Sequence, residues 1–182
     1  MKPISMDMLS LLAIFASANV PALAAEFPDP IAPAASGQLQ CYMPDTARKT
    51  CNSLAGYRSN PNGGIDNFAT VLMSKNPVLT MQTVSPVEIR MGQVCGKLGR
   101  KDIDTAKFTL NGRPVDEQQA AQLRAQLLMA FQNAFDHDVC TGYVNQGGSL
   151  VAKAVVDGVP VAQTADQQVI WVSPSDGYQV SP

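Results

Sequence analysis

Residues 116–135 read DEQQAAQLRAQLLMAFQNAF, and this stretch carries the clearest periodicity in the chain. Its apolar residues recur at intervals of three and four, which places them on one face of a helix. They are Ala120, Leu123, Leu127, Ala130, Phe131 and Ala134, with Leu128 and Phe135 widening the face. Asp116 precedes Gln119 by three residues, a capping-box pattern. The stretch predicts an amphipathic helix over 116–135 laid against a sheet, with a partner-binding helix as the alternative.

Short strand candidates lie on both sides of this helix. Before it they are 39–43, 68–73, 78–84, 87–91 and 108–110, and after it 139–144, 150–156 and 168–172. Asn111-Gly112 predicts a type I′ turn. Several strands, one long helix and further strands predict the α+β class, with a mainly antiparallel sheet, the 116–135 helix packed on one face, and disulfides stabilising the domain.

The amino terminus has the pattern of a signal peptide over residues 1–24. Lys2 precedes an uncharged apolar stretch, and Ala22 and Ala24 supply the small residues before a cleavage site. An uncleaved anchor is the alternative, because residues 8–25 are long enough to approach a membrane span. We expect a Pro/Ala-rich linker over 25–37, one globular α+β domain over 38–182, and no transmembrane segment after cleavage. The expected location is periplasmic or secreted.

The four cysteines, Cys41, Cys51, Cys95 and Cys140, all follow the predicted cleavage site. An even number of cysteines in an exported chain indicates two disulfides, for which three connectivities exist. We favour Cys41–Cys51, which flanks a turn-rich segment, and Cys95–Cys140, which ties a strand before the helix to the segment after it. The absence of CxxC pairs and the presence of a single histidine argue against a redox motif and a structural zinc site.

The charge of the chain is unevenly distributed. A net charge of −2 argues against a nucleic-acid partner. Residues 38–113 carry ten Lys and Arg against five acids, whereas 114–182 carry two against seven. Lys97, Arg100 and Lys101 are candidates for a basic patch that meets an anionic partner. The alternative is that the two halves of one domain attract each other.

Few residues in the sequence indicate a catalytic or ligand-binding site. The sequence Asp136-His137-Asp138 is a candidate ligand or metal site or an oriented base, and the alternative is a structural histidine beside a helix C-terminus. No nucleophile elbow, phosphate-binding loop or dinucleotide fingerprint occurs in the sequence. Several aromatic residues near strand ends are candidates for a ligand site, an interface or the core: Tyr42, Tyr57, Tyr143, Trp171 and Tyr178.

These observations predict an exported, disulfide-bonded binding or interaction module of the cell envelope. We expect it to be non-catalytic, to use no cofactor or metal, and to bind another protein or an envelope component. One alternative is a small extracytoplasmic hydrolase or isomerase with an acidic site near Asp136, His137 and Asp138. A structural envelope protein is a third possibility.

Overall fold

The computed structural model describes residues 29–160 and 166–182, in which antiparallel strands predominate. The short helices are η1 (Ala32–Ser36), α1 (Arg100–Asp104), α2 (Glu117–Ala130) and η2 (Pro174–Asp176). The strands are β1 (Leu39–Tyr42), β2 (Thr50–Cys51), β3 (Ser53–Ser59), β4 (Ile65–Lys75), β5 (Val78–Arg90), β6 (Gln93–Lys97), β7 (Lys107–Leu110), β8 (Arg113–Pro114), β9 (Asp138–Gln146), β10 (Ser149–Val156), β11 (Val159–Pro160), β12 (Gln167–Val172) and β13 (Gln179–Val180). The predicted signal peptide lies outside the described residues.

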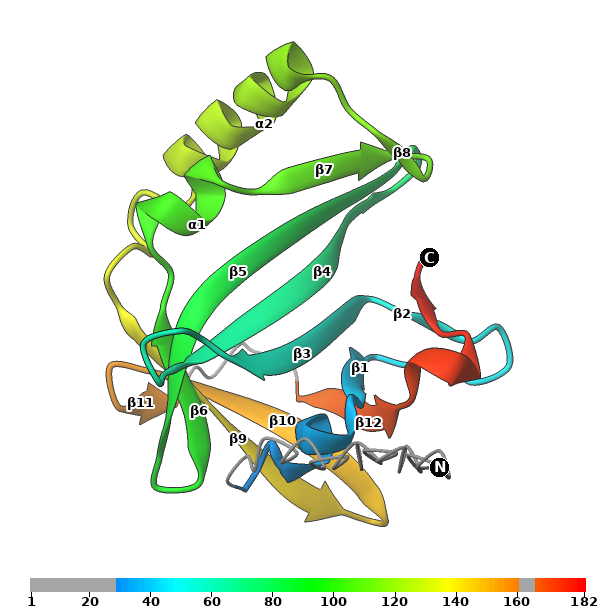
Figure 1. Cartoon of the computed structure of the whole chain (residues 1–182), viewed down its shortest axis with the longest axis vertical. Coiled ribbons are helices and arrows are strands. Elements are labelled where there is room, and N and C mark those ends of the chain that lie inside the picture. Colours follow the sequence, from blue (N-terminus) through cyan, green and yellow to red (C-terminus); the bar gives the residue numbers. More distant parts are fainter. Residues whose placement is uncertain (1–28, 161–165) are drawn as a thin grey trace, which may run out of the picture.

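Within these residues, eight strands close into a barrel (Figure 1). Neighbouring strands follow the order β4-β3-β1-β12-β10-β9-β6-β5, and β5 pairs again with β4 to complete the ring. Every pairing in the ring is antiparallel. The predicted α+β class, with a long helix packed on one face of a sheet, is therefore wrong.

The helix that suggested that class is shorter than predicted and lies outside the barrel. It begins as expected, because the Asp116 side chain accepts a hydrogen bond from the Gln119 backbone N–H at 2.8 Å. It ends at Ala130, and its apolar residues Leu123 and Leu127 pack beside β7 and the adjoining end of β5. The prediction failed because barrel closure depends on pairs far apart in sequence, such as β1 with β12.

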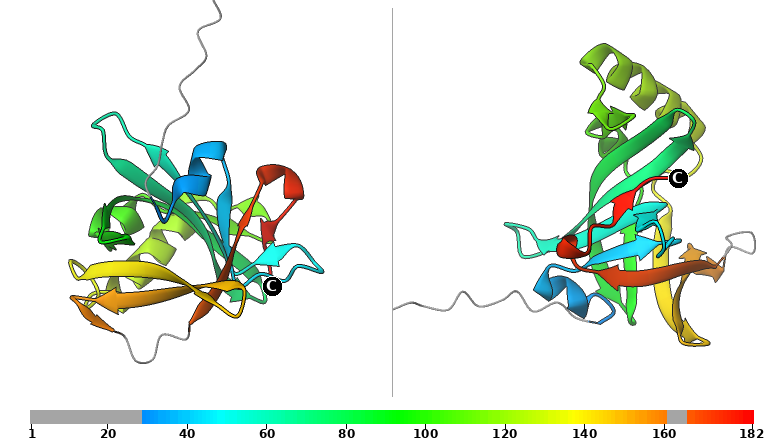
Figure 2. Two further views of the ribbon diagram at one scale, coloured as in Figure 1. Left: turned by 90° about the horizontal axis from the view of Figure 1, so that it is seen from below. Right: turned by 90° about the vertical axis from the view of Figure 1, so that its right-hand side faces the viewer.

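The long strand β5 joins the barrel to a projecting arm (Figure 2). It pairs with β4 along most of its length, with β7 through Leu79–Gln82 and with β6 through Glu88–Arg90. Pro86 lies where the pairing with β6 has ended, and it has no N–H to donate to a neighbouring strand. The two strands predicted over 78–84 and 87–91 are thus one. We call β7, β8, α1, α2 and the adjoining ends of β4 and β5 the arm.

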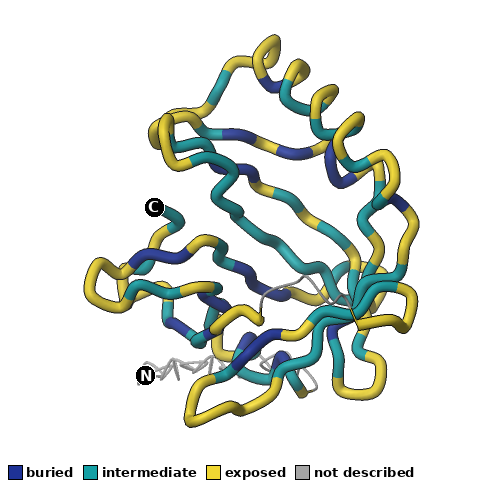
Figure 3. Tube along the Cα trace, turned by 180° about the vertical axis from the view of Figure 1, so that it is seen from behind, coloured by how far each residue is buried: buried dark blue, intermediate teal, exposed yellow. Residues whose placement is uncertain are grey.

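One apolar cluster fills the arm, and another lies at one end of the barrel. In the arm, Met81, Ala106, Phe108 and Ala120 form a filled core. At one end of the barrel, Ile31 just before η1 is fully buried and packs with Tyr57 and Val94. Figure 3 shows these buried stretches against the mostly exposed outer face of α2. The described part of the predicted 25–37 linker therefore includes a residue that closes the barrel.

Both disulfides join the pairs that we favoured from the sequence. Cys41 in β1 is bonded to Cys51 in β2, and Cys95 in β6 is bonded to Cys140, which lies directly opposite in β9. Two disulfides indicate an oxidising, extracytoplasmic compartment. No helix in the part of the chain that the structure describes has the length and apolar character needed to cross a membrane.

Candidate functional site

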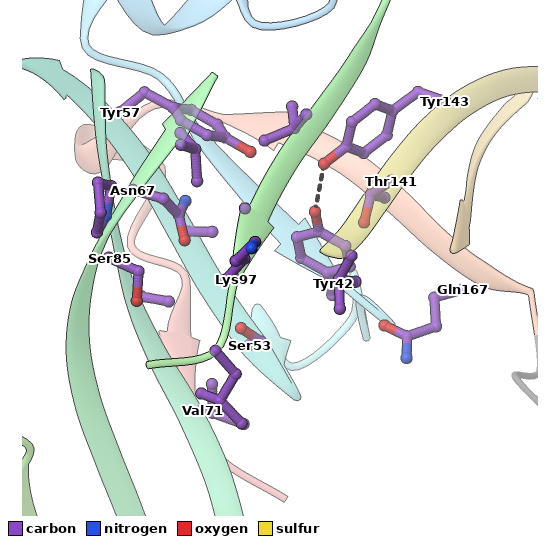
Figure 4. A pocket seen from close by; sticks show the side chains of 18 residues that line it. Tyr42, Ser53, Tyr57, Asn67, Val71, Ser85, Lys97, Thr141, Tyr143 and Gln167 are labelled. Atoms are coloured by element: carbon purple, nitrogen blue, oxygen red, sulfur yellow. Dashed lines mark hydrogen bonds between the residues drawn. The ribbon is translucent and has the colours of Figure 1, made fainter. Parts of the chain in front are cut away.

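An open cavity of about 470 Å³ lies within the barrel, and Figure 4 shows it from close by. This volume falls within the range of sites that bind small molecules. An eight-stranded barrel is wide enough to hold one small ligand when its interior side chains leave room. The described residues that line the cavity are Tyr42, Ser53, Ala55, Tyr57, Asn67, Ala69, Val71, Ser85, Pro86, Val87, Val94, Gly96, Lys97, Leu98, Val139, Thr141, Tyr143 and Gln167.

Small side chains at inward positions leave this space open. Alternate residues of a strand face the same side, so Ala55, Ala69 and Ser85 present only short side chains to the lumen. Gly96 adds no side chain, and a Cβ there would come within 3.1 Å of the Pro86 carbonyl oxygen. The sequence thus folds into a closed wall of strands without filling its interior.

A buried glutamine and three tyrosines form the main polar cluster beside this cavity. Gln40 is fully buried, and its Oε1 accepts hydrogen bonds from Tyr57 Oη at 2.8 Å and from Tyr42 and Tyr143 Oη at 3.1 Å each. The hydroxyls of Tyr42 and Tyr143 lie 2.6 Å apart, with either able to donate (Figure 4). We call these four residues the tyrosine–glutamine cluster.

Burial keeps two of these phenols protonated. It raises the pKa of Tyr42 and the pKa of Tyr57 well above the ordinary value, and the nearby Tyr143 raises both further. Desolvation disfavours the charged phenolate, so these hydroxyls remain neutral hydrogen-bonding groups. The cluster can therefore donate or accept hydrogen bonds within an otherwise largely apolar lumen.

The cavity extends to the end of the barrel where β6 ends. Lys97, the last residue of β6, is exposed and is the one charged residue among the described residues that line the cavity. Its strand neighbour Asp138 lies five residues before Tyr143, which corresponds to about 17 Å of extended β9. The backbones of Lys97 and Tyr143 are thus well separated along the strands.

A second hollow of about 450 Å³ lies outside the barrel, between β4, β5 and the arm. Phe68 and Val84 line it from the barrel side, and Thr105 and Lys107 line it from the arm. These lining residues form no hydrogen-bonded cluster like the one in the lumen. We therefore regard the lumen as the candidate site.

In the predicted acidic site, the side chains of His137 and Asp138 pair with different residues. His137 Nδ1 pairs with Asp157 Oδ2 at 2.5 Å, whereas Asp138 pairs with Arg90. Asp136 lies in the turn after α2 with a positive φ of 65°. Among residues 29–160 and 166–182, no group of three or more His, Cys, Asp or Glu side chains is placed to hold a metal ion.

The predicted basic patch is likewise divided between different settings. Lys97 borders the cavity, whereas the Arg100 guanidinium lies over the Phe135 ring at 4.9 Å from its centroid. Lys101 is exposed on α1. Binding of an anionic partner by these residues remains a prediction.

Of the candidate residues named from the sequence, the aromatic residues include the most that line the cavity. Tyr42, Tyr57 and Tyr143 all line the lumen, and Trp171 packs against the buried cluster that contains Tyr57. Tyr178 instead packs outside, near the Cys41–Cys51 disulfide. Sequence reasoning missed Gln40, although it stands two residues before Tyr42 and must share its face of β1.

Comparison of the chain with protein-family models, curated proteins and solved structures finds no match.

Proposed function

We propose that this protein is an exported binding module that takes one small, mostly apolar molecule into the lumen of its barrel. The observation that carries the proposal is the cavity of about 470 Å³ bounded by short apolar side chains and the tyrosine–glutamine cluster. Sites for small molecules typically combine an apolar lining with a few convergent polar groups. The proposed mechanism is reversible binding: the apolar wall supplies affinity, and the polar cluster supplies orientation.

Ligand access in this proposal is from the end of the barrel opposite Ile31. Ile31 is completely buried and closes its end of the barrel, whereas Lys97 and Gln167 at the other end are exposed. Both exposed residues border the cavity. A molecule entering there would pass a polar rim before it reached the apolar wall.

The test uses N-phenyl-1-naphthylamine, a neutral apolar dye whose fluorescence rises on transfer from water. We expect saturable binding at about one dye per chain. Ser85→Phe places a bulky side chain in the lumen and should weaken binding about tenfold, equivalent to about 1.4 kcal/mol. Val84→Phe is the matched control, because Val84 is the preceding residue, is 43% exposed and lines the outer hollow.

Circular dichroism and thermal unfolding should confirm that both variants remain folded. Equal dye affinity in Ser85→Phe and Val84→Phe would place the dye outside the lumen and contradict the proposal. Failure of the wild-type protein to bind the dye saturably, with calorimetry also showing no binding, would contradict it as well.

Export is the second part of the proposal. We propose that residues 1–24 are a cleaved signal peptide, and that the mature protein is periplasmic or secreted. The intact mass of protein recovered from the exported fraction should match cleavage after Ala24. Thiol labelling without reduction should modify none of the four cysteines, because all four are paired. A retained amino terminus or a labelled thiol would contradict this part.

A further inference from the structure

We propose that the lumen recognises a neutral hydrogen-bond acceptor, such as a ketone, ester or amide carbonyl, on its apolar ligand. This inference rests on the proposed function and deepens it by naming the polar group that the ligand carries. It is argued from the hydrogen-bonding groups of Gln40, Tyr42, Tyr57 and Tyr143.

The tyrosine–glutamine cluster holds more donors than it can use. Its three hydroxyl protons are all used within the cluster, because Tyr57 and at least one of Tyr42 and Tyr143 donate to the Gln40 amide oxygen and the last proton can be shared within the Tyr42–Tyr143 pair. The amide nitrogen of Gln40 is different: its two protons have no partner among the described residues, although the side chain is fully buried. A buried donor without a partner is costly, so the cluster lacks an acceptor.

An acceptor in the lumen would supply what the cluster lacks. If the Gln40 amide makes half a turn, its nitrogen faces the tyrosine oxygens and donates to them. One of Tyr42 and Tyr143 still donates to the other across 2.6 Å, and the remaining hydroxyl proton is then free to point to a ligand oxygen in the cavity. The amide oxygen takes the place that the nitrogen left, and an unpartnered carbonyl is tolerated more readily than an unpartnered N–H. A ligand that offered only donors would leave the free tyrosine proton without a partner.

The position of the charged residues favours a neutral acceptor over a carboxylate. Lys97 is the one charged residue among the described residues around the cavity, and it lies at the end away from Tyr143. A carboxylate beside the tyrosines would be desolvated without a cation close by, which is unfavourable. A carbonyl carries no such penalty and can accept from the free hydroxyl.

Three naphthalene probes of similar size test the inference: 2-acetylnaphthalene, 2-ethylnaphthalene and 2-naphthoate. Calorimetry measures each affinity in the wild-type protein and in the double variant Tyr42→Phe/Tyr143→Phe. We expect the double variant to weaken binding of the ketone about tenfold and to change binding of the hydrocarbon less than about twofold. Tyr178→Phe is the control, because Tyr178 packs outside the lumen.

Infrared spectroscopy of the bound ketone gives a readout that is independent of affinity. The carbonyl stretch should lie lower in the wild-type complex than in the double variant, because hydrogen bonding weakens the C=O bond. If the ketone and the hydrocarbon both bind, and the double variant weakens their affinities equally, the acceptor inference is wrong while the proposed function stands. If 2-naphthoate binds more tightly than the ketone and the hydrocarbon, the inference of a neutral acceptor is also wrong. If none of the probes binds, both proposals fail.

Discussion

One face of β5 is filled at one end of the strand and hollow at the other. In the arm, Leu79 and Met81 of β5 pack with Phe108 and the apolar residues of α2. Further along the same face, Ser85 and Val87 border the cavity of the barrel. Both regions belong to the same strand. Side-chain volume and the presence of a covering helix therefore decide which region has a packed interior. The following predictions test this contrast, beginning with the largest expected effect.

Phe108→Ala should cost about 3–5 kcal/mol of the free energy of unfolding, because it removes a nearly fully buried aromatic ring from a packed core. Val71→Ala, in the wall of the lumen, should cost only about 1 kcal/mol, because Val71 already borders open space. Chemical denaturation monitored by circular dichroism measures both values. Similar costs for the two variants would break the contrast between the filled arm and the hollow barrel.

The two disulfides should stabilise the barrel unequally. Their sequence separations are 45 residues for Cys95–Cys140 and 10 for Cys41–Cys51. In the loop-entropy account, removing the first by Cys95→Ala/Cys140→Ala costs roughly 4 kcal/mol. Removing the second by Cys41→Ala/Cys51→Ala costs about 2–3 kcal/mol. Denaturant titrations of both double variants test the order, and a reversed order would show that strain or residual structure outweighs loop length.

Asp116→Ala should cost about 1 kcal/mol, because it removes the side chain that accepts from the Gln119 backbone N–H. The effect should be confined to the arm. Amide hydrogen exchange is therefore expected to accelerate in α2, with dye binding in the lumen unchanged. A loss of dye affinity in this variant would show that the two regions are coupled.

The His137–Asp157 pair gives the smallest expected effect, because both side chains are about half exposed. The hydrogen bond to Asp157 raises the pKa of His137 above 6.5, and the same bond lowers the pKa of Asp157 below 3.8. The stabilisation from the raised His137 pKa is fully present below pH 6.5 and is lost as pH rises through the folded-state value. The stabilisation from Asp157 is present above pH 3.8 and is lost as pH falls through its lowered value.

Wild-type protein should therefore exceed His137→Gln in thermal stability most clearly between about pH 4 and 6.5. The difference should shrink by pH 9, and thermal unfolding at the two ends of this range measures it. A difference that does not vary with pH would mean that the pair does not titrate as its geometry implies. Dye binding provides the control, because neither residue borders the cavity.

The sequence supported several local features of the arm and the barrel. Asn111 and Gly112 both have positive φ, as the predicted type I′ turn requires. The hairpin predicted from 139–144 and 150–156 is β9 and β10, and the cap at Asp116 is present. These features depend on residues close together in the chain, so local patterns were sufficient to predict them.

The candidate site was only partly accessible to sequence reasoning. The aromatic residues named as possible ligand contacts include three that line the lumen, but nothing in the sequence joins them into one cluster. Tyr42 and Tyr143 are 101 residues apart, and their hydroxyls meet only because β1, β12, β10 and β9 are consecutive in the ring. The site predicted at Asp136, His137 and Asp138 stays a prediction, and the structure adds only that His137 pairs with Asp157 and Asp138 with Arg90.

The sequence by itself supported the favoured cysteine pairs, most of the strands and the start of the helix. The alternation of side chains along a strand also fixed which residues share a face. Only the tertiary structure decided that these faces enclose a cavity. Alternation specifies which residues share a face, but it does not specify whether the sheet stays open or closes on itself. Closure follows from pairing β4 with β5 and β1 with β12, and the second of these contacts joins segments from opposite ends of the described chain.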